Sequence, residues 1–186
     1  AMYEDINHDG VINKYDIVYL GNTQPLVTGG GGVTVKYKQV TLSAFFHGRF
    51  GQSIVNMARM NNESMYGSSN QSKAVLRRWK NEGDNTDIPR ALYNEGRNYL
   101  GSDRFVEKAS FVRLKSMTLS YGFPRKICNR FNVNSLSVFV TGYNLFTWTN
   151  YTGQDPEVST NSSNLAIDTA TTPVAKRFSF GLNMSF

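Results

Sequence analysis

The last ten residues of the chain alternate between apolar and polar side chains without interruption. An apolar side chain stands at every second position, namely Phe178, Phe180, Leu182, Met184 and Phe186. Small or polar residues fill the positions between them. Successive side chains of a β-strand point to opposite faces, so the pattern predicts a strand over 177–186 with one apolar and one polar face.

Four more segments have the same period of two. They are predicted as strands over 29–38, 40–50, 110–122 and 133–146. In the third of them the apolar phase changes between Leu114 and Met117, which predicts a β-bulge near Lys115 and Ser116. The glycine run 29–32 is interpreted as a flexible lead-in to the first strand.

The connections between these strands alternate in length. Lys38-Gln39 and a turn containing Pro124 are short, whereas 51–109 and 147–175 are long and polar. Outer-membrane barrels have short periplasmic turns and long extracellular loops, and their tilted strands need about 9 to 11 residues. Five strands cannot close a barrel, since even the smallest has about eight. The prediction is an all-β fold: antiparallel strands over 29–186 that form the C-terminal part of a transmembrane β-barrel, with 1–28 as an extracellular loop.

Composition excludes several other classes. No stretch approaches the roughly 18 consecutive apolar residues of a membrane-spanning helix, and no signal peptide is visible at the N-terminus. The net charge of +6 is scattered, and its one cluster, 77–80, is too short for a nucleic-acid-binding stripe. The single cysteine, Cys128, cannot form an internal disulfide and is expected to be a small, half-buried residue.

Aromatic residues stand near the predicted strand ends and suit the interfacial girdles of a membrane barrel. They are Tyr121, Phe123, Phe146, Trp148 and Tyr151. For Trp148 and Tyr151, packing inside a loop is an equally good interpretation.

One motif carries metal chemistry. Its predicted calcium ligands are Asp5, Asn7, Asp9, Val11 through its carbonyl, and Asp16, in a D-x-N-x-D-G pattern with Gly10 at the sharp turn. Hard cations such as Ca²⁺ need several oxygens at fixed spacing, and an extracellular loop would meet abundant calcium. The alternative is a plain turn whose acidic side chains cap backbone N–H groups.

The sequence offers no catalytic set. His8 and His47 are far apart in the chain, so neither a His-centred triad nor a zinc cluster is indicated. The chain is therefore not expected to be an enzyme.

The whole chain resembles the TonB-dependent transporters of the SusC/RagA type. The resemblance depends on the order of several motifs: 5–12, Arg78-Trp79 with Gly83-Asp84, 88–90, 109–121, 141–149, Tyr151, Gly153, 155–157 and the terminal Phe186. Each motif is modest alone, but the order is specific to that family.

This resemblance implies a plugged barrel of about 22 strands in the outer membrane. It implies import of glycans or peptides, energised by TonB through N-terminal regions that this chain lacks, with a SusD-like lipoprotein as a lid. The terminal apolar residues 178, 180, 182, 184 and 186 resemble the signal read by the barrel-assembly machinery. The long loop offers Arg77, Arg78, Trp79 and Arg90 as weak candidates for contacts with substrate or lid. The simpler interpretation, which we prefer, is that Trp79 and Pro89-Arg90 hold the loop together.

The alternative is a soluble, secreted, calcium-binding β-sandwich. In it, exposed aromatics such as Trp79, Tyr93 and Tyr99 would stack on carbohydrate. A sandwich must bury the apolar faces of its strands, whereas a membrane barrel presents them to lipid.

Overall fold

A computed structural model describes residues 2–158 and 166–186. The chain divides into two compact units. The loop unit comprises 1–24, 53–108 and 152–171, and the sheet unit comprises 25–52, 109–151 and 172–186. The predicted loop 147–175 includes 159–165, which lie outside the described residues.

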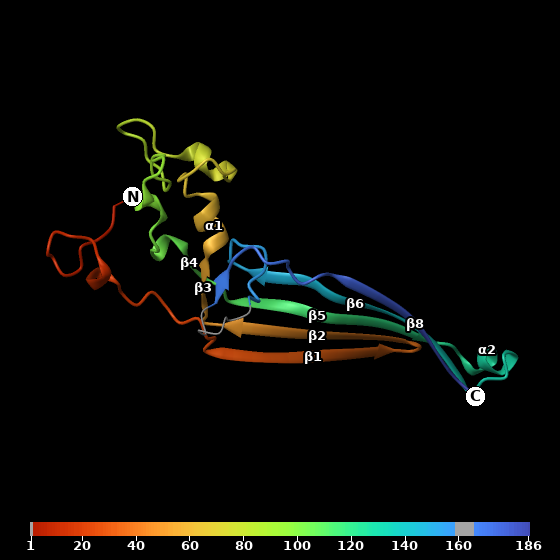
Figure 1. Ribbon diagram of the computed structural model, residues 1–186. Coiled ribbons are helices and arrows are strands. Elements are labelled where there is room, and N and C mark those ends of the chain that lie inside the picture. The colour runs from red at the N-terminus through yellow and green to blue at the C-terminus, as the bar shows by residue number, and fades with distance from the viewer. Residues whose placement is uncertain (1, 159–165) are drawn as a thin grey trace. The chain divides into compact units, whose positions relative to one another are not determined.

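The sheet unit is a single antiparallel sheet of five strands in the order β1-β2-β5-β6-β8, which lie side by side in Figure 1. The strands are β1 (Val27–Tyr37), β2 (Val40–Phe50), β5 (Phe111–Gly122), β6 (Ser135–Thr149) and β8 (Arg177–Ser185). Each predicted strand is confirmed to within three residues at either end. β1 and β8 pair on one side only and form the two edges.

The predicted bulge in β5 is confirmed. The pairing of β5 with both of its neighbours shifts between Leu114 and Ser116, which leaves Lys115 without a register partner. On the β6 side, Asn144 has a φ of 54°, in the left-handed region that asparagine tolerates better than most residues.

The glycine run 29–32 is not a flexible lead-in, and that interpretation is wrong. These residues lie within β1 and pair one by one with β2, from Gly29 opposite Gly48 to Gly32 opposite Phe45. The Phe45 ring crosses the strand here, since a Cβ at Gly30 would lie 3.0 Å from Phe45 Cζ. Glycine is needed for this close approach and not for flexibility.

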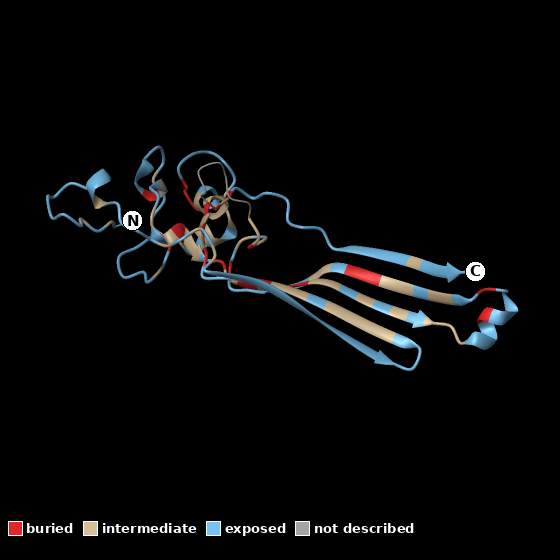
Figure 2. Cartoon of the chain, turned by 90° about the horizontal axis from the view of Figure 1, so that it is seen from below, coloured by how far each residue is buried: buried red, intermediate tan, exposed pale blue. Residues whose placement is uncertain are grey.

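Directly paired residues share a face of a sheet, so the register defines an apolar face that crosses all five strands. It comprises Val33, Val35, Tyr37, Val40, Leu42, Ala44, Met117, Leu119, Tyr121, Leu136, Val138, Val140, Phe178, Phe180, Leu182 and Met184. Much of it is accessible, up to 79% for Phe180. In Figure 2 the edge strands β1 and β8 are almost entirely coloured as exposed.

The opposite, polar face of the sheet carries mostly hydroxyl and basic side chains. Thr34 and Ser43 hydrogen-bond across β1 and β2 at 2.9 Å, and Thr118 and Thr141 across β5 and β6 at 2.8 Å. These cross-strand pairs satisfy the hydroxyl groups and fix the register. The apolar face therefore favours an apolar environment, and the polar face favours water.

The chain connects the strands in two ways at the two ends of the sheet. At the end formed by Tyr37, Val40, Gly122 and Ser135, the connections are short. One of them contains a helix that the sequence did not predict, α2 (Arg125–Arg130), and buries Cys128. At the other end, Phe50, Phe111 and Thr149 lead into the segments of the loop unit. The alternation of short and long connections is confirmed.

The loop unit contains structure that the sequence did not predict. A small sheet has the order β4-β3-β7, formed by β4 (Val106–Lys108), β3 (Ser53–Asn56) and β7 (Ile167–Asp168), with β7 parallel to β3. The helix α1 (Met57–Asn62) follows β3, and the 3₁₀ turns are η1 (Lys14–Asp16), η2 (Lys73–Arg77), η3 (Gly96–Tyr99) and η4 (Asp103–Phe105). Ile54, Ile88 and Phe105 are each 1% exposed and form its core. Within the described ranges, no helix has both the length and the apolar character needed to cross a membrane.

Candidate functional site

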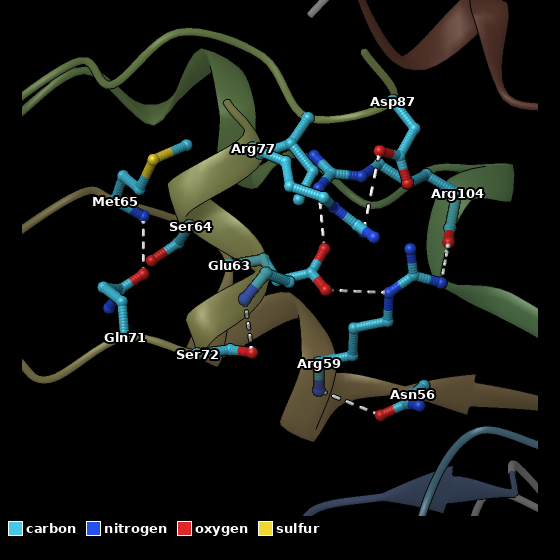
Figure 3. Close-up of polar contacts among 12 residues, drawn as sticks. Asn56, Arg59, Glu63, Ser64, Met65, Gln71, Ser72, Arg77, Asp87 and Arg104 are labelled. Atoms are coloured by element: carbon cyan, nitrogen blue, oxygen red, sulfur yellow. Dashed lines mark hydrogen bonds and ion pairs between the residues drawn. The ribbon is translucent and has the colours of Figure 1, made fainter. Parts of the chain in front are cut away.

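An ionic cluster holds the loop unit together around α1 (Figure 3). Glu63, whose side chain is 7% exposed, accepts from Arg59 Nε at 3.1 Å and from Arg104 Nη2 at 2.7 Å. Arg59 also reaches Glu107 at 3.3 Å. Burial lowers the pKa of Arg59, but attraction to Glu63 and Glu107 and the hydrogen bonds to them outweigh burial and leave it raised. The helix starts here because the Asn56 side chain caps it, accepting from Arg59 N at 2.9 Å.

The same cluster joins the two long segments of the loop unit. Glu107, from the first segment, accepts hydrogen bonds from the backbone N–H of Thr152 at 3.0 Å and from its hydroxyl at 2.8 Å. Burial raises the pKa of Glu107, but bonds from Thr152, Asn56 and Arg59 outweigh burial and leave it lowered. Val55 N also donates to the Ala166 carbonyl at 3.0 Å. The two segments therefore form one folded body.

Sequence reasoning missed this cluster. Its one local signal is the spacing of Arg59 and Glu63, four residues apart, which favours an ion pair only on a helix. That helix was not predicted, since α1 has six residues and too few periods for a clear pattern. Glu107 and Arg104 are more than 40 residues away, and only the fold brings them near.

Two of the candidate contact residues line one hollow of the loop unit. This hollow has a volume of about 420 Å³ and is lined by Met2, Trp79, Thr86, Asp87, Ile88, Pro89, Arg90 and Arg104. The backbone of this region is tied down: Trp79 N donates to the Ile88 carbonyl at 2.9 Å, and Asn98 Nδ2 to the Arg90 carbonyl at 2.7 Å. The side chains of Trp79 and Arg90 are left to line the hollow.

The other two candidates lie elsewhere. Arg77 lines a second hollow of about 540 Å³ beside α1 and forms an exposed ion pair with Asp87 at 3.8 Å. Arg78 Nη1 donates to the Val75 carbonyl of its own turn at 3.3 Å. The structure therefore does not bring the four candidates together at a single site.

The calcium-like motif forms a compact loop. Asp5 accepts from the backbone N–H of Asp9 at 3.2 Å and of Gly10 at 2.7 Å. Asn7 Nδ2 donates to Asp9 Oδ2 at 2.9 Å, and Asp9 accepts from Val11 N at 2.8 Å. Gly10 has a φ of 83°, the left-handed conformation that the sharp turn requires.

Asp16 closes the same loop from η1. Its carboxylate accepts from Ile6 N at 2.9 Å and from Asn13 N at 2.7 Å, and these backbone bonds lower its pKa. The bonds are those that the plain turn requires, and they also hold the proposed calcium ligands on one loop. Among the described residues, no three His, Cys, Asp or Glu side chains converge as a metal site would require.

The terminal strand has the two faces that were predicted. Phe178, Phe180, Leu182 and Met184 are exposed on the apolar face of β8, and Phe186 beyond it is 84% exposed. β8 pairs with β6 alone, so its outer edge keeps unpaired backbone groups within the described chain.

Aromatic residues stand at both ends of the sheet. At the end with the long connections, Phe146 and Trp148 are stacked with ring centroids 6.2 Å apart, and both are more than half exposed. At the other end, Tyr121 and Phe123 make an edge contact at 5.2 Å. Tyr151 is 6% exposed, so for this residue the packed interpretation is correct and the girdle is wrong.

Comparisons with known proteins agree with the fold. No family model matches the chain. It is 29% identical over 192 residues to TonB-dependent receptor P3 and 30% identical over 192 residues to TonB-dependent receptor P26, both of Formosa agariphila. These alignments cover 100% of this chain and 19% of each relative, so the chain spans about a fifth of their length.

Solved structures give the same result. The RagAB peptide transporter matches with a TM-score of 0.74 and 27% identity over 88% of this chain and 18% of that chain. The RagAB peptide importer in its open-open state matches with a TM-score of 0.72 and 26% identity over 88% of this chain and 17% of that chain. Homology to this class of receptors is thus established across the chain. The homologous proteins are named as receptors and peptide transporters, which agrees with the expectation of an outer-membrane protein that is not an enzyme.

Proposed function

We propose that this chain, which is homologous over its whole length to a segment making up about a fifth of TonB-dependent receptor P3, is part of the wall of an outer-membrane nutrient importer. Its five-stranded sheet would be part of a barrel whose other strands lie outside this chain. The loop unit would lie outside the cell. The imported nutrient would be an oligosaccharide or a peptide.

The observation that carries this proposal is the accessible apolar face of the sheet. Sixteen apolar positions in five neighbouring strands share one face, and the other face carries mostly hydroxyl and basic groups. An open apolar band of this extent is unusual on a protein surface in water, whereas lipid requires it. The aromatic residues at both strand ends fit the two membrane interfaces.

The partners follow from the relatives. The likeness to the RagAB peptide importer supports a SusD-like lipoprotein as the lid of this receptor. TonB would act through regions outside this chain. The barrel-assembly machinery and the lipid bilayer would contact the sheet unit, and no nucleic acid is expected.

Import is tested in cells. A strain that lacks the complete receptor should lose growth on the peptide or glycan that the receptor takes up, and a strain that lacks TonB should have the same defect. Growth is measured with protein hydrolysate or purified polysaccharide as the sole carbon source. Normal growth of the receptor deletion on every such nutrient would contradict the proposal.

We also propose a structural Ca²⁺ site in the loop 5–16. Asp5, Asn7, Asp9, the Val11 carbonyl and Asp16 supply oxygen donors, which suit Ca²⁺. The double variant Asp5→Asn, Asp9→Asn should abolish calcium binding by the complete receptor in titration calorimetry. Asp84→Asn is the matched control, because Asp84 also caps backbone N–H groups, at Lys80 and Asn81. Equal calcium binding by all three proteins would leave the plain turn as the correct interpretation.

The terminal residues are proposed as the assembly signal. An exposed strand edge with aromatic side chains can dock on another sheet before it meets its final neighbour. Deletion of Phe186 should reduce the amount of receptor in the outer membrane, with Phe131→Ala as the control because Phe131 is similarly exposed but outside β8. Undiminished assembly without Phe186 would argue against this role.

The hollow lined by Trp79 and Arg90 is proposed as a contact for substrate or lid. Alanine at either position should weaken binding of the lid lipoprotein or uptake, whereas Arg78→Ala should not, because Arg78 donates within its own turn. Unchanged uptake and lid binding in the Trp79 and Arg90 variants would assign them to holding the loop together.

A further inference from the structure

The two units of the chain differ in their acidic residues, which are confined to one of them. All 14 Asp and Glu residues lie in the loop unit. The sheet unit has none, yet it contains half of the 20 Lys and Arg residues. These are Lys36, Lys38, Arg49, Arg113, Lys115, Arg125, Lys126, Arg130, Lys176 and Arg177. The sheet unit therefore has ten positive charges and no negative charge.

The register places the basic residues of the strands on one face. Lys36 is opposite Thr41, Arg113 is opposite His47, and Arg177 is opposite Tyr143, all on the polar face. Arg49 follows His47 by two residues and shares that face. Lys115 is the bulged residue, and the apolar face contains no charge.

Membrane crossing does not explain this one-sided pattern. Lipid disfavours both signs of charge on the face that it contacts. On a polar face in contact with water, Asp and Glu are as acceptable as Lys and Arg. The strands keep the cations and lack the carboxylates, so the sign of the charge itself calls for an explanation.

Three of these cations are available for a ligand. Lys36 and Arg177 are exposed, and Arg49 is half-buried. The Arg177 guanidinium lies 5.7 Å from the centroid of the Tyr143 ring, which leaves its N–H groups free to bond elsewhere. Arg49 Nε is shielded from solvent and has no hydrogen-bond partner among the described residues. Arg113, which donates to Thr147 at 2.9 Å, adds to the positive field.

We propose that the polar face of this sheet selects nutrient oligomers that carry carboxylate groups. The inference depends on the import function proposed above, which turns this face toward the interior of the barrel. A wall of one charge sign raises the local concentration of oppositely charged ligands and steers their approach. Arginine then binds a carboxylate through two parallel N–H bonds, which a neutral amide or hydroxyl does not match.

The carboxylates that meet this face have two conceivable sources. One is the nutrient, which we propose. The other is the receptor itself, through acidic residues in the four fifths of its relatives' length that this chain does not span. The two sources predict different stabilities for the ligand-free receptor. Only carboxylates of the receptor itself would pair with the cations there, so that the cations stabilise the fold.

The first experiment measures ligand preference in the complete receptor. The probes are oligoglutamate against oligoglutamine of equal length, and oligogalacturonate against its neutral methyl ester. We expect at least one acidic probe to bind about tenfold or more tightly than its neutral counterpart, less so at high salt. The peptide pair and the sugar pair show which polymer carries the carboxylates. Equal binding within both pairs would overturn the inference.

The variants Arg49→Gln and Arg177→Gln assign the preference to this face. Each should weaken binding of the preferred acidic probe by roughly tenfold. The control is Lys126→Gln, which removes the same charge from exposed α2 and should change binding by less than about twofold. Variants that behave like this control would refute the assignment even if the receptor prefers acidic probes.

Thermal unfolding of the ligand-free variants decides between the two sources. If the nutrient supplies the carboxylates, loss of a cation leaves the midpoint unchanged or raises it, because like charges no longer repel. A lowered midpoint in both variants would identify internal carboxylates and overturn the inference. A receptor that imports neutral and acidic oligomers equally would keep the import function and lose only this inference.

Discussion

Replacement of Glu63 by glutamine should greatly lower the free energy needed to open the loop unit, although glutamine has almost the same size as glutamate. Glu63 is the shared acceptor of Arg59 and Arg104, and its side chain is 7% exposed. Gln keeps the shape but removes the charge. Arg59 would keep Glu107 at 3.3 Å. Arg104 would lose its partner at 2.7 Å, and its Nε and Nη1 are already buried without partners among the described residues.

The magnitude follows from this burial. Removal of one partner from a buried ion pair costs about 3 to 5 kcal/mol, because an uncompensated charge remains. Arg59 and Arg104 are 28% and 18% exposed, so solvent screens part of that cost. The low end, about 3 kcal/mol, is expected. That value corresponds to a roughly hundredfold faster exchange of amide hydrogens that need the loop unit to open.

The assay is hydrogen exchange of the complete receptor, read by mass spectrometry over peptides from 53–108. Arg77→Gln is the matched control, since it breaks the exposed Arg77–Asp87 pair at 3.8 Å and should cost between about 0 and 1 kcal/mol. If Glu63→Gln and Arg77→Gln accelerate exchange equally, the cluster does not hold the loop unit together and the reasoning is refuted.

Three further changes test other parts of the chain. Leu182→Arg, on the apolar face, should lower the stability of the receptor in the membrane by about 2 to 4 kcal/mol. It should also reduce the folded fraction seen on SDS gels of unheated samples, whereas Asn183→Arg on the polar face should do neither. Gly181→Ala should lower the urea midpoint by an amount equivalent to about 1 to 3 kcal/mol, because its Cβ would overlap the Phe139 ring; an unchanged midpoint would argue against that contact. Folding lowers the pKa of Glu107, so its stabilising effect should be full above the unfolded pKa of about 4.3 and should fade below it. Amide hydrogens of 53–108 should therefore exchange faster in acid, relative to the intrinsic rate, and Glu107→Gln should remove this pH dependence.

The sheet could be predicted from the sequence because its pattern is local. The period of two can be recognised within each strand's own segment of sequence. Even the bulge at Lys115 is visible as a change of phase between Leu114 and Met117. The interpretation of the glycine run was wrong because the residue that requires glycine there, Phe45, belongs to the neighbouring strand β2, and its ring lies over β1. The sequence shows which residues are small, but only the pairing of the strands shows which neighbouring side chain occupies the space beside them.

The loop unit could not be predicted for the opposite reason. Its strands are two to four residues long and its helix α1 has six, so none contains enough periods to be recognised. Their stability comes from contacts between distant segments, such as Arg104 with Glu63 and Glu107 with Thr152. No local spacing encodes such pairs.

The sequence by itself determined the strand positions, the two faces of each strand and the order of short and long connections, because these depend on neighbouring residues. Only the tertiary structure decided that the faces align into one apolar and one polar surface. It also decided that Lys36, Arg49 and Arg177 share the polar surface, since register between strands sets which residues stand opposite one another. A charge count alone, +6 for the chain, hides the confinement of all 14 acidic residues to the loop unit.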